Sequence, residues 1–211
     1  MWLIGSVIGG YDVRVQENVA YHTELVLLAE SLGLRIATVK NVVTALNVLD
    51  NIDVLFLLSV PAQLKSTLLK TARLLVYTPS NEHFGIVPLE AMLAGVPVLA
   101  ANSGGPLETI TDGETGWLRP VERAEGWTAV MQQALQVLTD DVLFKMGEAG
   151  KRRVKREFSE TRMAQRLDEE IEKMVDSPRV AATELQDLLL GVSIIGVVIV
   201  SVFAVLFRLL N

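Results

Sequence analysis

The sequence contains no cysteine and only two histidines, His22 and His83. Without cysteine the chain can form neither a disulfide nor a thiolate metal site, and such a composition fits a reducing compartment. With only two histidines, a zinc site is not predicted either. Basic residues are also outnumbered, with 19 Lys and Arg against 25 Asp and Glu among the 211 residues, which gives a formal net charge of -6 at pH 7. A chain without a broad cationic field is not expected to bind nucleic acid.

Charge of either sign is missing from one long run near the C-terminus. Half of the residues are hydrophobic and the mean hydropathy is +0.38, which is apolar for a globular domain of this size. Residues 188–207 form 20 consecutive positions without a charge, a length that crosses a bilayer core as a helix. We therefore expect a transmembrane helix over residues 188–208 and a linker over 179–187. A buried core helix is the alternative, but such a helix normally carries a polar stripe, whereas this run has only Ser193 and Ser201.

The first 178 residues alternate short β-branched runs with amphipathic helical stretches. This alternation is typical of a Rossmann-like, doubly wound parallel sheet, so we expect one α/β domain over residues 1–178. Residues 34–54 fit the alternation poorly and are expected to form an insertion. The expected strands are 3–8, 54–58, 74–77 and 98–100, and the expected helices are 16–32, 62–70, 127–138, 140–156 and 161–175.

The most informative segment runs from Tyr77 to Met92, where a strand ends, a polar loop follows and a short helix begins near Pro88. Ligands of open parallel sheets bind beyond the carboxyl ends of the strands. Loop amides and a helix N-terminus favour an anionic diphosphate there. Glu82 lies in the loop and Glu90 about one turn into the helix, and ionised carboxylates accept hydrogen bonds from sugar hydroxyls. The segment therefore predicts a site for a ligand with both groups.

Glycines accompany this segment and also form a second loop. Gly85 lets the backbone approach a ligand, and the paired Gly104 and Gly105 do the same in the loop over 102–108, which leads into another helix. A third loop, over 112–118, is rich in turn residues. Taken singly these features have ordinary explanations, because acidic residues near a helix start are usually caps and Gly-Gly is usually a turn. Their combination is far more specific.

Glu82-x7-Glu90 followed by the Gly-Gly loop resembles the signature of the retaining GT-B glycosyltransferases of family four. Within them, the chain is similar to the eukaryotic α-1,3/1,6-mannosyltransferases of dolichol-linked oligosaccharide assembly. Many other relatives have Gly-Gly-x-Pro-Glu where this chain has Pro106-Leu107-Glu108 after the paired glycines. The segments that carry the resemblance are Gly9–Asn18, Tyr77–Pro79, Glu82–Met92 and Gly104–Glu108.

The resemblance implies the C-terminal half of a GT-B fold and an enzyme that transfers mannose from GDP-mannose with retention. It would make α-1,3 and α-1,6 linkages on the dolichol-diphosphate-linked core glycan at the cytosolic face of the endoplasmic reticulum membrane. The C-terminal helix would then contact membrane lipid and hold the domain on the cytosolic side. No cofactor is implied beyond the donor substrate, and no metal is predicted, because the sequence has no Asp-x-Asp motif at a strand end.

Residue roles carry over by position. The resemblance implies that Glu82 is the catalytic residue, which holds hydroxyls of the transferred sugar. Glu90 would bind the donor ribose, and the amides of Phe84 and Gly85 would lie near the sugar or the diphosphate. The remaining donor-binding positions implied are Ile86, Gly104, Gly105 and Gly10.

The acceptor-binding N-terminal domain of a GT-B enzyme, with its basic diphosphate-binding residues, is expected to be missing from this sequence. Three interpretations stay open. The chain is a truncated form of such a mannosyltransferase, a non-catalytic or complementing subunit, or a GT-B transferase with a different nucleotide-sugar donor. A complementing subunit would need the missing domain, or another mannosyltransferase of the pathway, as its partner.

Overall fold

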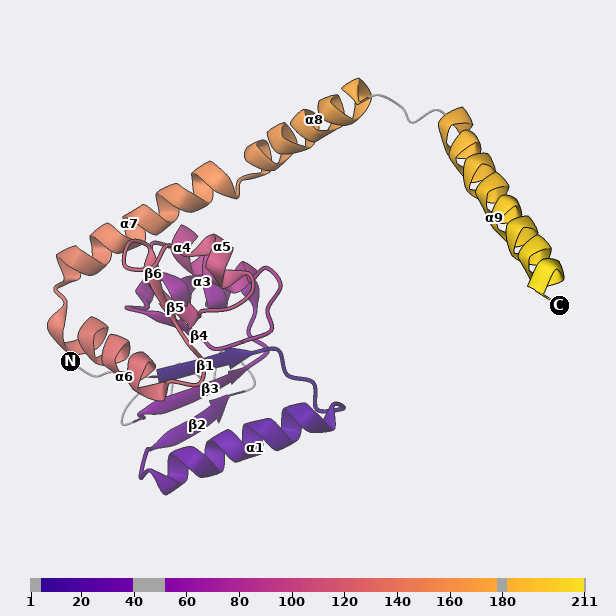
Figure 1. The fold of residues 1–211 in the computed structure, drawn as a ribbon. Coiled ribbons are helices and arrows are strands. Elements are labelled where there is room, and N and C mark those ends of the chain that lie inside the picture. The colour runs from indigo at the N-terminus through magenta and orange to yellow at the C-terminus, as the bar shows by residue number, and fades with distance from the viewer. Residues whose placement is uncertain (1–4, 40–51, 178–181, 211) are drawn as a thin grey trace. The chain divides into compact units, whose positions relative to one another are not determined.

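The computed structural model describes residues 5–39, 52–177 and 182–210. The chain divides into two compact units, Met1–Ser159 and Glu160–Asn211 (Figure 1). The first unit contains all the strands of the described residues, and the second contains two helices. The predicted domain boundary at residue 178 lies outside the described residues and stays a prediction.

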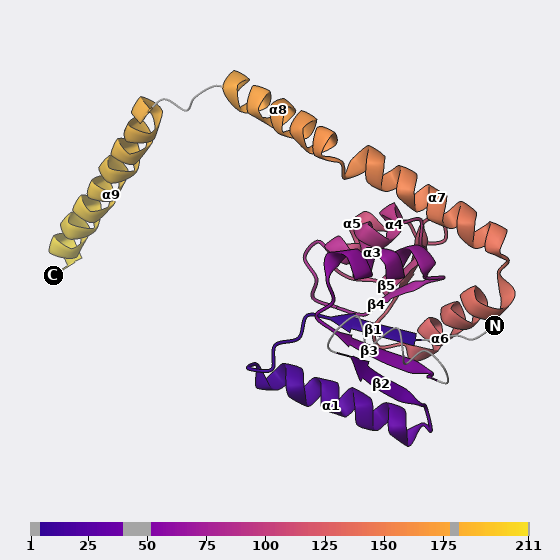
Figure 2. The same ribbon diagram turned by 180° about the vertical axis from the view of Figure 1, so that it is seen from behind.

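The first unit begins with a three-stranded parallel sheet. Its strands are β1 (Gly5–Gly9), β2 (Ile36–Val39) and β3 (Val54–Leu58), in the order β1-β3-β2. Leu55 and Leu57 of β3 pack with Val39 of β2 in a small buried cluster, as expected for strands rich in branched apolar residues. Helix α1 (Gln16–Ser31) lies beside β2 in both of the opposite views of Figures 1 and 2.

A second three-stranded parallel sheet follows, with β4 (Leu75–Tyr77), β5 (Val98–Ala101) and β6 (Gly116–Arg119) in the order β4-β5-β6. All four residues of the central strand β5 are buried. Alternate residues of a strand point to opposite faces. Val98 and Ala100 accordingly join one hydrophobic cluster, and Leu99 and Ala101 join another. This sheet is therefore covered on both faces, which is the usual state of a parallel sheet.

Helices supply the rest of the two clusters. Met92 of α4 and Val154 of α7 belong to the cluster of Val98, and Trp127 of α6 and Leu143 of α7 belong to the cluster of Leu99. Helix α7 thus contributes to both faces. The helices of this region are α3 (Ala62–Thr71), α4 (Ile86–Leu93), α5 (Pro106–Thr109), α6 (Ala124–Gln132), the π-helix η1 (Gln133–Val137) and α7 (Asp140–Glu157).

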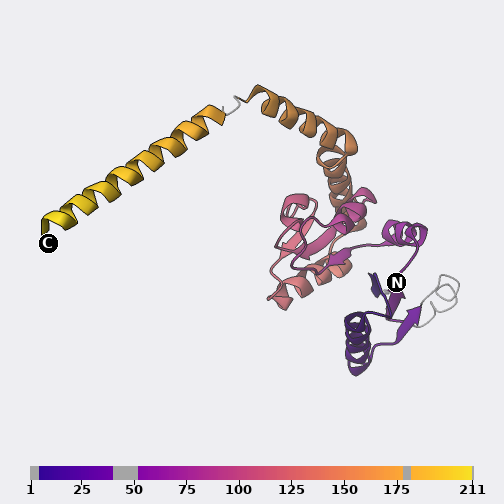
Figure 3. The ribbon, with the colours of Figure 1, turned by 90° about the vertical axis from the view of Figure 1, so that its right-hand side faces the viewer.

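The second unit consists of α8 (Glu160–Asp176) and α9 (Ala182–Leu210). Helix α8 buries none of its residues. Helix α9 is one continuous helix (Figure 3) and contains the segment predicted to span a membrane. Among the described residues, no helix has the length and apolar character needed to cross a membrane. Positions 203–208 of the predicted span lie outside the side chains that the structure describes.

The predicted Rossmann-like α/β class is confirmed, with parallel pairing throughout the described strands. The described strands form two three-stranded sheets instead of the one doubly wound sheet that was predicted. Two local predictions were wrong. Residues 36–39, assigned to an insertion, form β2. Residues 116–119, of which 116–118 belong to the predicted turn-rich loop, form β6. Strand pairing explains both, because β2 and β6 gain long-range hydrogen bonds to β3 and β5 that local sequence does not reveal. The helix predicted to begin near Pro88 is confirmed, since α4 begins two residues earlier, at Ile86.

Candidate functional site

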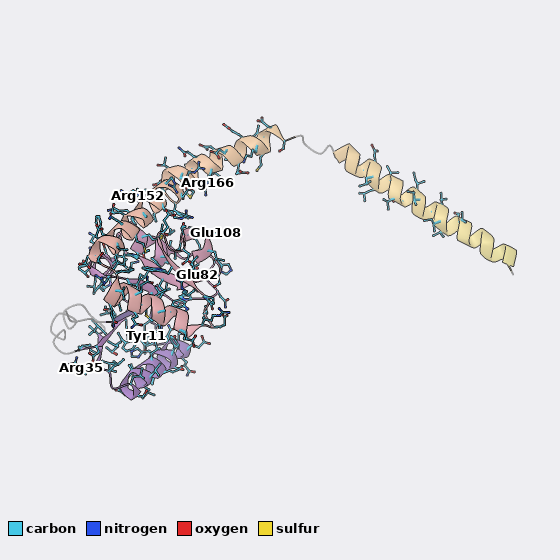
Figure 4. The ribbon with its side chains drawn as sticks, turned by 60° about the vertical axis from the view of Figure 1, so that its left-hand side comes forward. Tyr11, Arg35, Glu82, Glu108, Arg152 and Arg166 are labelled. Atoms are coloured by element: carbon cyan, nitrogen blue, oxygen red, sulfur yellow. The ribbon has the colours of Figure 1, made fainter. Side chains whose placement is uncertain are left out.

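The predicted site lies in the loop that joins β4 to α4. Gly85 precedes the first helical residue with φ +78°, a left-handed conformation that favours glycine. This turn redirects the chain from the polar loop into the helix, so that the amides of Ile86 and Val87 open its first turn. Amides at that position have no partner within the helix. Figure 4 labels Glu82, which lies in the same loop.

The carboxylate of Glu82 is held by two donors. The Tyr77 hydroxyl donates to Oε2 at 2.8 Å, and the Phe84 amide donates to Oε1 at 3.3 Å. These hydrogen bonds stabilise the charged carboxylate and hold the pKa of the Glu82 carboxyl below its usual range, and the bond from Tyr77 has the largest effect. Burial, followed by the bond to Glu82, raises the pKa of Tyr77 to about 12. At neutral pH the site therefore presents an oriented anion beside a protonated phenol.

The second predicted carboxylate, Glu90, forms an ion pair with Lys65 of α3. The Lys65 Nζ atom lies 2.7 Å from Oε1 and 2.8 Å from Oε2, so one ammonium contacts both oxygens. Both side chains are partly buried. The pair joins α3 to α4 and fixes the direction in which the Glu90 carboxylate points.

The paired glycines pack directly against the backbone of the Glu82 loop. The Gly105 amide donates to the Glu82 carbonyl at 2.8 Å, and the Ser103 hydroxyl donates to the Ser80 carbonyl at 2.8 Å. A Cβ atom at Gly104 would lie 2.2 Å from the Glu82 carbonyl oxygen, and one at Gly105 would lie 2.3 Å from the Phe84 carbonyl oxygen. Both distances are far shorter than any real contact, so only glycine allows the two loops to meet. The close approach that the structure describes is therefore to the neighbouring loop, and the approach to a ligand stays a prediction.

Helix α7 supports this pair of loops. The Arg153 guanidinium donates to the carbonyls of Glu108 and Thr109, at 2.8 and 2.9 Å, where α5 ends. It also lies 5.9 Å from the centre of the Phe158 ring, and that ring meets Phe84 edge to face at 6.1 Å between centroids. Phe84 is thus held on one side while 45% of its surface stays exposed. Contacts from Arg153 of α7 and from Phe158, which follows α7, therefore hold the two loops in place.

Most of the predicted site residues come together in this region. Glu82, Phe84, Gly85 and Ile86 follow one another in the loop and the first helical turn, and Gly104 and Gly105 touch that loop. Glu90 is one turn further along α4. Gly10 lies instead in the loop after β1, where the neighbouring Tyr11 amide donates to the Ser59 hydroxyl at 2.9 Å beyond the end of β3.

Two contact residues were missed by sequence reasoning. Tyr77 was noted only as part of the motif at the end of β4, and nothing in the sequence indicates that its hydroxyl meets Glu82 five residues later. Lys65 lies on a helix whose other lysine, Lys70, is exposed, so it has the appearance of an ordinary surface lysine. Only the packing of α3 beside α4 reveals its contact with Glu90.

A family of known proteins matches this part of the chain. The model of the family described as glycosyl transferases, group 1, matches residues 20–153, which include β4, α4 and the glycine loop. The matched range covers more than half of the chain and contains all the predicted site residues except Gly10.

Curated relatives with high identity share one description. The chain is 58% identical over 170 residues to the α-1,3/1,6-mannosyltransferase alg-2 of Neurospora crassa, a match of 80% of this chain and 36% of that protein. It is 50% identical to the protein of that description from Schizosaccharomyces pombe, over 78% of this chain and 32% of that protein. It is 41% identical to the protein of that description from Saccharomyces cerevisiae, over 80% of this chain and 36% of that protein. The chain spans about a third of the length of these relatives.

Solved structures of lower identity share the fold. The sucrose-phosphate synthase of Thermosynechococcus elongatus matches with a TM-score of 0.59 at 23% identity, over 81% of this chain and 38% of that one. Anabaena HepE in complex with UDP-glucose matches with a TM-score of 0.60 at 22% identity, over 80% and 40%. At this identity the likeness concerns the path of the backbone alone.

Proposed function

We propose that this chain, which belongs to the group 1 glycosyl transferases, forms the donor-binding half of an α-1,3/1,6-mannosyltransferase. The observation that carries the proposal is the Glu82 carboxylate, which Tyr77 and the Phe84 amide hold at the start of α4. The identity of 58% to a protein described by that activity supports the choice of mannose among donors.

The site residues suit GDP-mannose. Glu82 is an acceptor for the hydroxyls of the mannose, since a carboxylate offers only acceptors and each hydroxyl brings a donor. The amides of Ile86 and Val87 and the dipole of α4 face the diphosphate, whose negative charge they favour. Glu90, on the next turn, accepts from the ribose. No cofactor or metal enters the proposal, because amides and a helix N-terminus carry the diphosphate recognition.

The remaining parts of the proposal rest on the resemblance to the mannosyltransferases of dolichol-linked oligosaccharide assembly. We propose that the acceptor is the dolichol-diphosphate-linked core glycan and that the protein works at the endoplasmic reticulum membrane with this unit on the cytosolic side. In that arrangement the predicted span over residues 188–208, whose side chains the structure describes only as far as residue 202, serves as the membrane anchor. A cytosolic donor and a lipid-linked acceptor would then meet at the membrane surface, where the donor site is held.

Donor binding by the purified full chain tests the proposal. Calorimetry with GDP-mannose, GDP and UDP-glucose should show tighter binding of the guanine nucleotides. E82Q should weaken GDP-mannose by about tenfold and leave GDP unchanged, because only the sugar loses a charge-assisted acceptor. E122Q, which removes a charge from an exposed turn, is the matched control. Tighter binding of UDP-glucose would favour a transferase with a different donor, and equal weakening of GDP-mannose and GDP by E82Q would place Glu82 outside the sugar site.

A further inference from the structure

The ion pair between Lys65 and Glu90 links two helices through a single ammonium group. The Lys65 Nζ atom contacts both carboxylate oxygens, at 2.7 and 2.8 Å, and about one third of each side chain is exposed. The two residues belong to different helices and lie 25 positions apart in the sequence. A partly exposed pair of this kind contributes little to stability, so stability alone is a weak reason for it.

The contact has a direct consequence for hydrogen bonding. An ionised carboxylate offers about four acceptor sites, two on each oxygen. One ammonium that contacts both oxygens uses one site on each and leaves the other site of each oxygen for further donors. Two neighbouring hydroxyls, as on a ribose, match two such acceptors. Lys65 also restricts the rotamers of a flexible side chain before any ligand arrives, which reduces the entropy lost on binding.

The charge of Lys65 matters as well. An unpaired carboxylate near a nucleotide diphosphate would repel it, because both are anions. With Lys65 in contact the pair is formally neutral, so Glu90 can approach an anionic ligand and still accept hydrogen bonds. Lys65 therefore removes a repulsion as well as fixing the geometry.

We propose that Lys65 is a positioning residue of the donor site, which neutralises and orients Glu90 so that its carboxylate accepts both hydroxyls of the donor ribose. This inference rests on the proposed function, because it requires a nucleotide donor. It adds a residue that acts through Glu90 and that belongs to α3, outside the loop and helix that carry the rest of the site.

The test compares GDP with 2′-deoxy-GDP and 3′-deoxy-GDP on the full chain. The unsubstituted protein should bind GDP about tenfold more tightly than either deoxynucleotide, the preference expected for one charge-assisted hydrogen bond. K65M should bind all three with nearly equal affinity, whereas K65R should keep the preference, since arginine retains the charge and can contact both oxygens. K70M, which changes the exposed lysine of the same helix, should behave as the unsubstituted protein.

The outcomes separate the two proposals. If K65M weakens GDP and both deoxynucleotides by the same factor and keeps the ribose preference, Lys65 does not act through Glu90 and the inference is overturned. The inference also fails alone if the unsubstituted chain binds GDP without any ribose preference. If the chain binds no guanine nucleotide but binds UDP, the proposed donor is wrong, and UDP with its two deoxy forms gives the same test of Lys65. Absence of binding to either nucleotide overturns both. A thermal melt of each variant shows whether it is folded, and K65Q is the second charge-removing variant should K65M unfold.

Discussion

At the scale of single residues, the site depends on how carboxylates are restrained. Tyr77 at the end of β4 and the Phe84 amide hold the two oxygens of Glu82, while one ammonium, that of Lys65, contacts both oxygens of Glu90. The partners differ in charge. A neutral hydroxyl leaves Glu82 with its full negative charge, whereas an ammonium compensates that of Glu90. The two carboxylates therefore suit different parts of one elongated ligand.

The substitution Y77F tests the restraint on Glu82. The pKa of the Glu82 carboxyl should rise toward its ordinary value, because the lost bond stabilises the charged form. Side-chain carboxyl NMR across an acid titration measures this directly. A depressed pKa adds stability above the unfolded-state value, and that contribution is lost as the pH falls through the folded-state value. The stability difference between the two proteins should therefore shrink on acidification.

The control for this titration is Y21F, which removes the hydroxyl of an exposed tyrosine on α1. It should leave the Glu82 titration unchanged. An unaltered Glu82 pKa in Y77F would mean that the hydroxyl contact does not govern the charge of the site.

At the scale of elements, the site is a contact between two loops. The loop from β4 to α4 carries the acidic residue, and the glycine loop after β5 lies against its backbone. Parallel pairing places the carboxyl ends of β4 and β5 side by side, so both loops leave the sheet at the same edge. Helix α7 then braces them through Arg153 and Phe158. The orientation of the site thus depends on three elements at once.

The substitution G104A tests this loop contact. Gly104 has φ +58°, and its added Cβ would lie 2.2 Å from the Glu82 carbonyl oxygen. Gly113 has φ +78° but an added Cβ there meets no atom within 4 Å, so G113A isolates the cost of the left-handed backbone. We expect G113A to lower the free energy of unfolding by about 1–2 kcal/mol. G104A should cost a further ~1–3 kcal/mol because the loops are forced apart. Urea denaturation measures both, and equal losses would contradict a tight contact.

At the scale of the whole molecule, the first unit holds the hydrophobic core. All three buried clusters lie within Met1–Ser159, and α8 of the second unit buries no residue. The last buried residue of these clusters is Val154 of α7. The first unit therefore has its own source of stability, which does not depend on residues of the second unit.

A chain that ends at Ser159 should retain cooperative thermal unfolding, with a Tm within about 4 °C of that of the full chain. This expectation follows because the deletion removes no residue of the three clusters. A chain that ends at Leu138 loses the buried Leu143 and Val154 and should not fold cooperatively. Loss of the cooperative transition in the longer chain would show that the second unit is needed for folding.

Much of this architecture could be predicted from local sequence. The strands near 54–58, 74–77 and 98–100 and the helices over 16–32 and 140–156 are confirmed to within a few residues. They were predictable because continuous apolar runs and helical periodicity are local properties. Strand β6 was not, since its segment is rich in turn residues and is extended only through its pairing with β5.

The candidate site divides in a similar way. The spacing of Glu82, Glu90 and the paired glycines identifies the family, and that membership is confirmed. The roles of these residues in donor binding stay predictions. The glycines were expected to approach a ligand, whereas their described close approach is to the neighbouring loop. A glycine pair indicates a close approach to its backbone, but the sequence does not show whether a ligand or another loop makes that approach.

The sequence by itself determined the family, the α/β class and the stretch of chain where the site is predicted, because each depends on residue types at fixed spacings along one chain. Only the tertiary structure decided which groups restrain the two carboxylates. The hydroxyl of Tyr77 and the ammonium of Lys65 reach Glu82 and Glu90 across turns and between helices. Such contacts depend on how α3, β4 and α4 pack together, and this packing brings together residues that are not neighbours in the sequence.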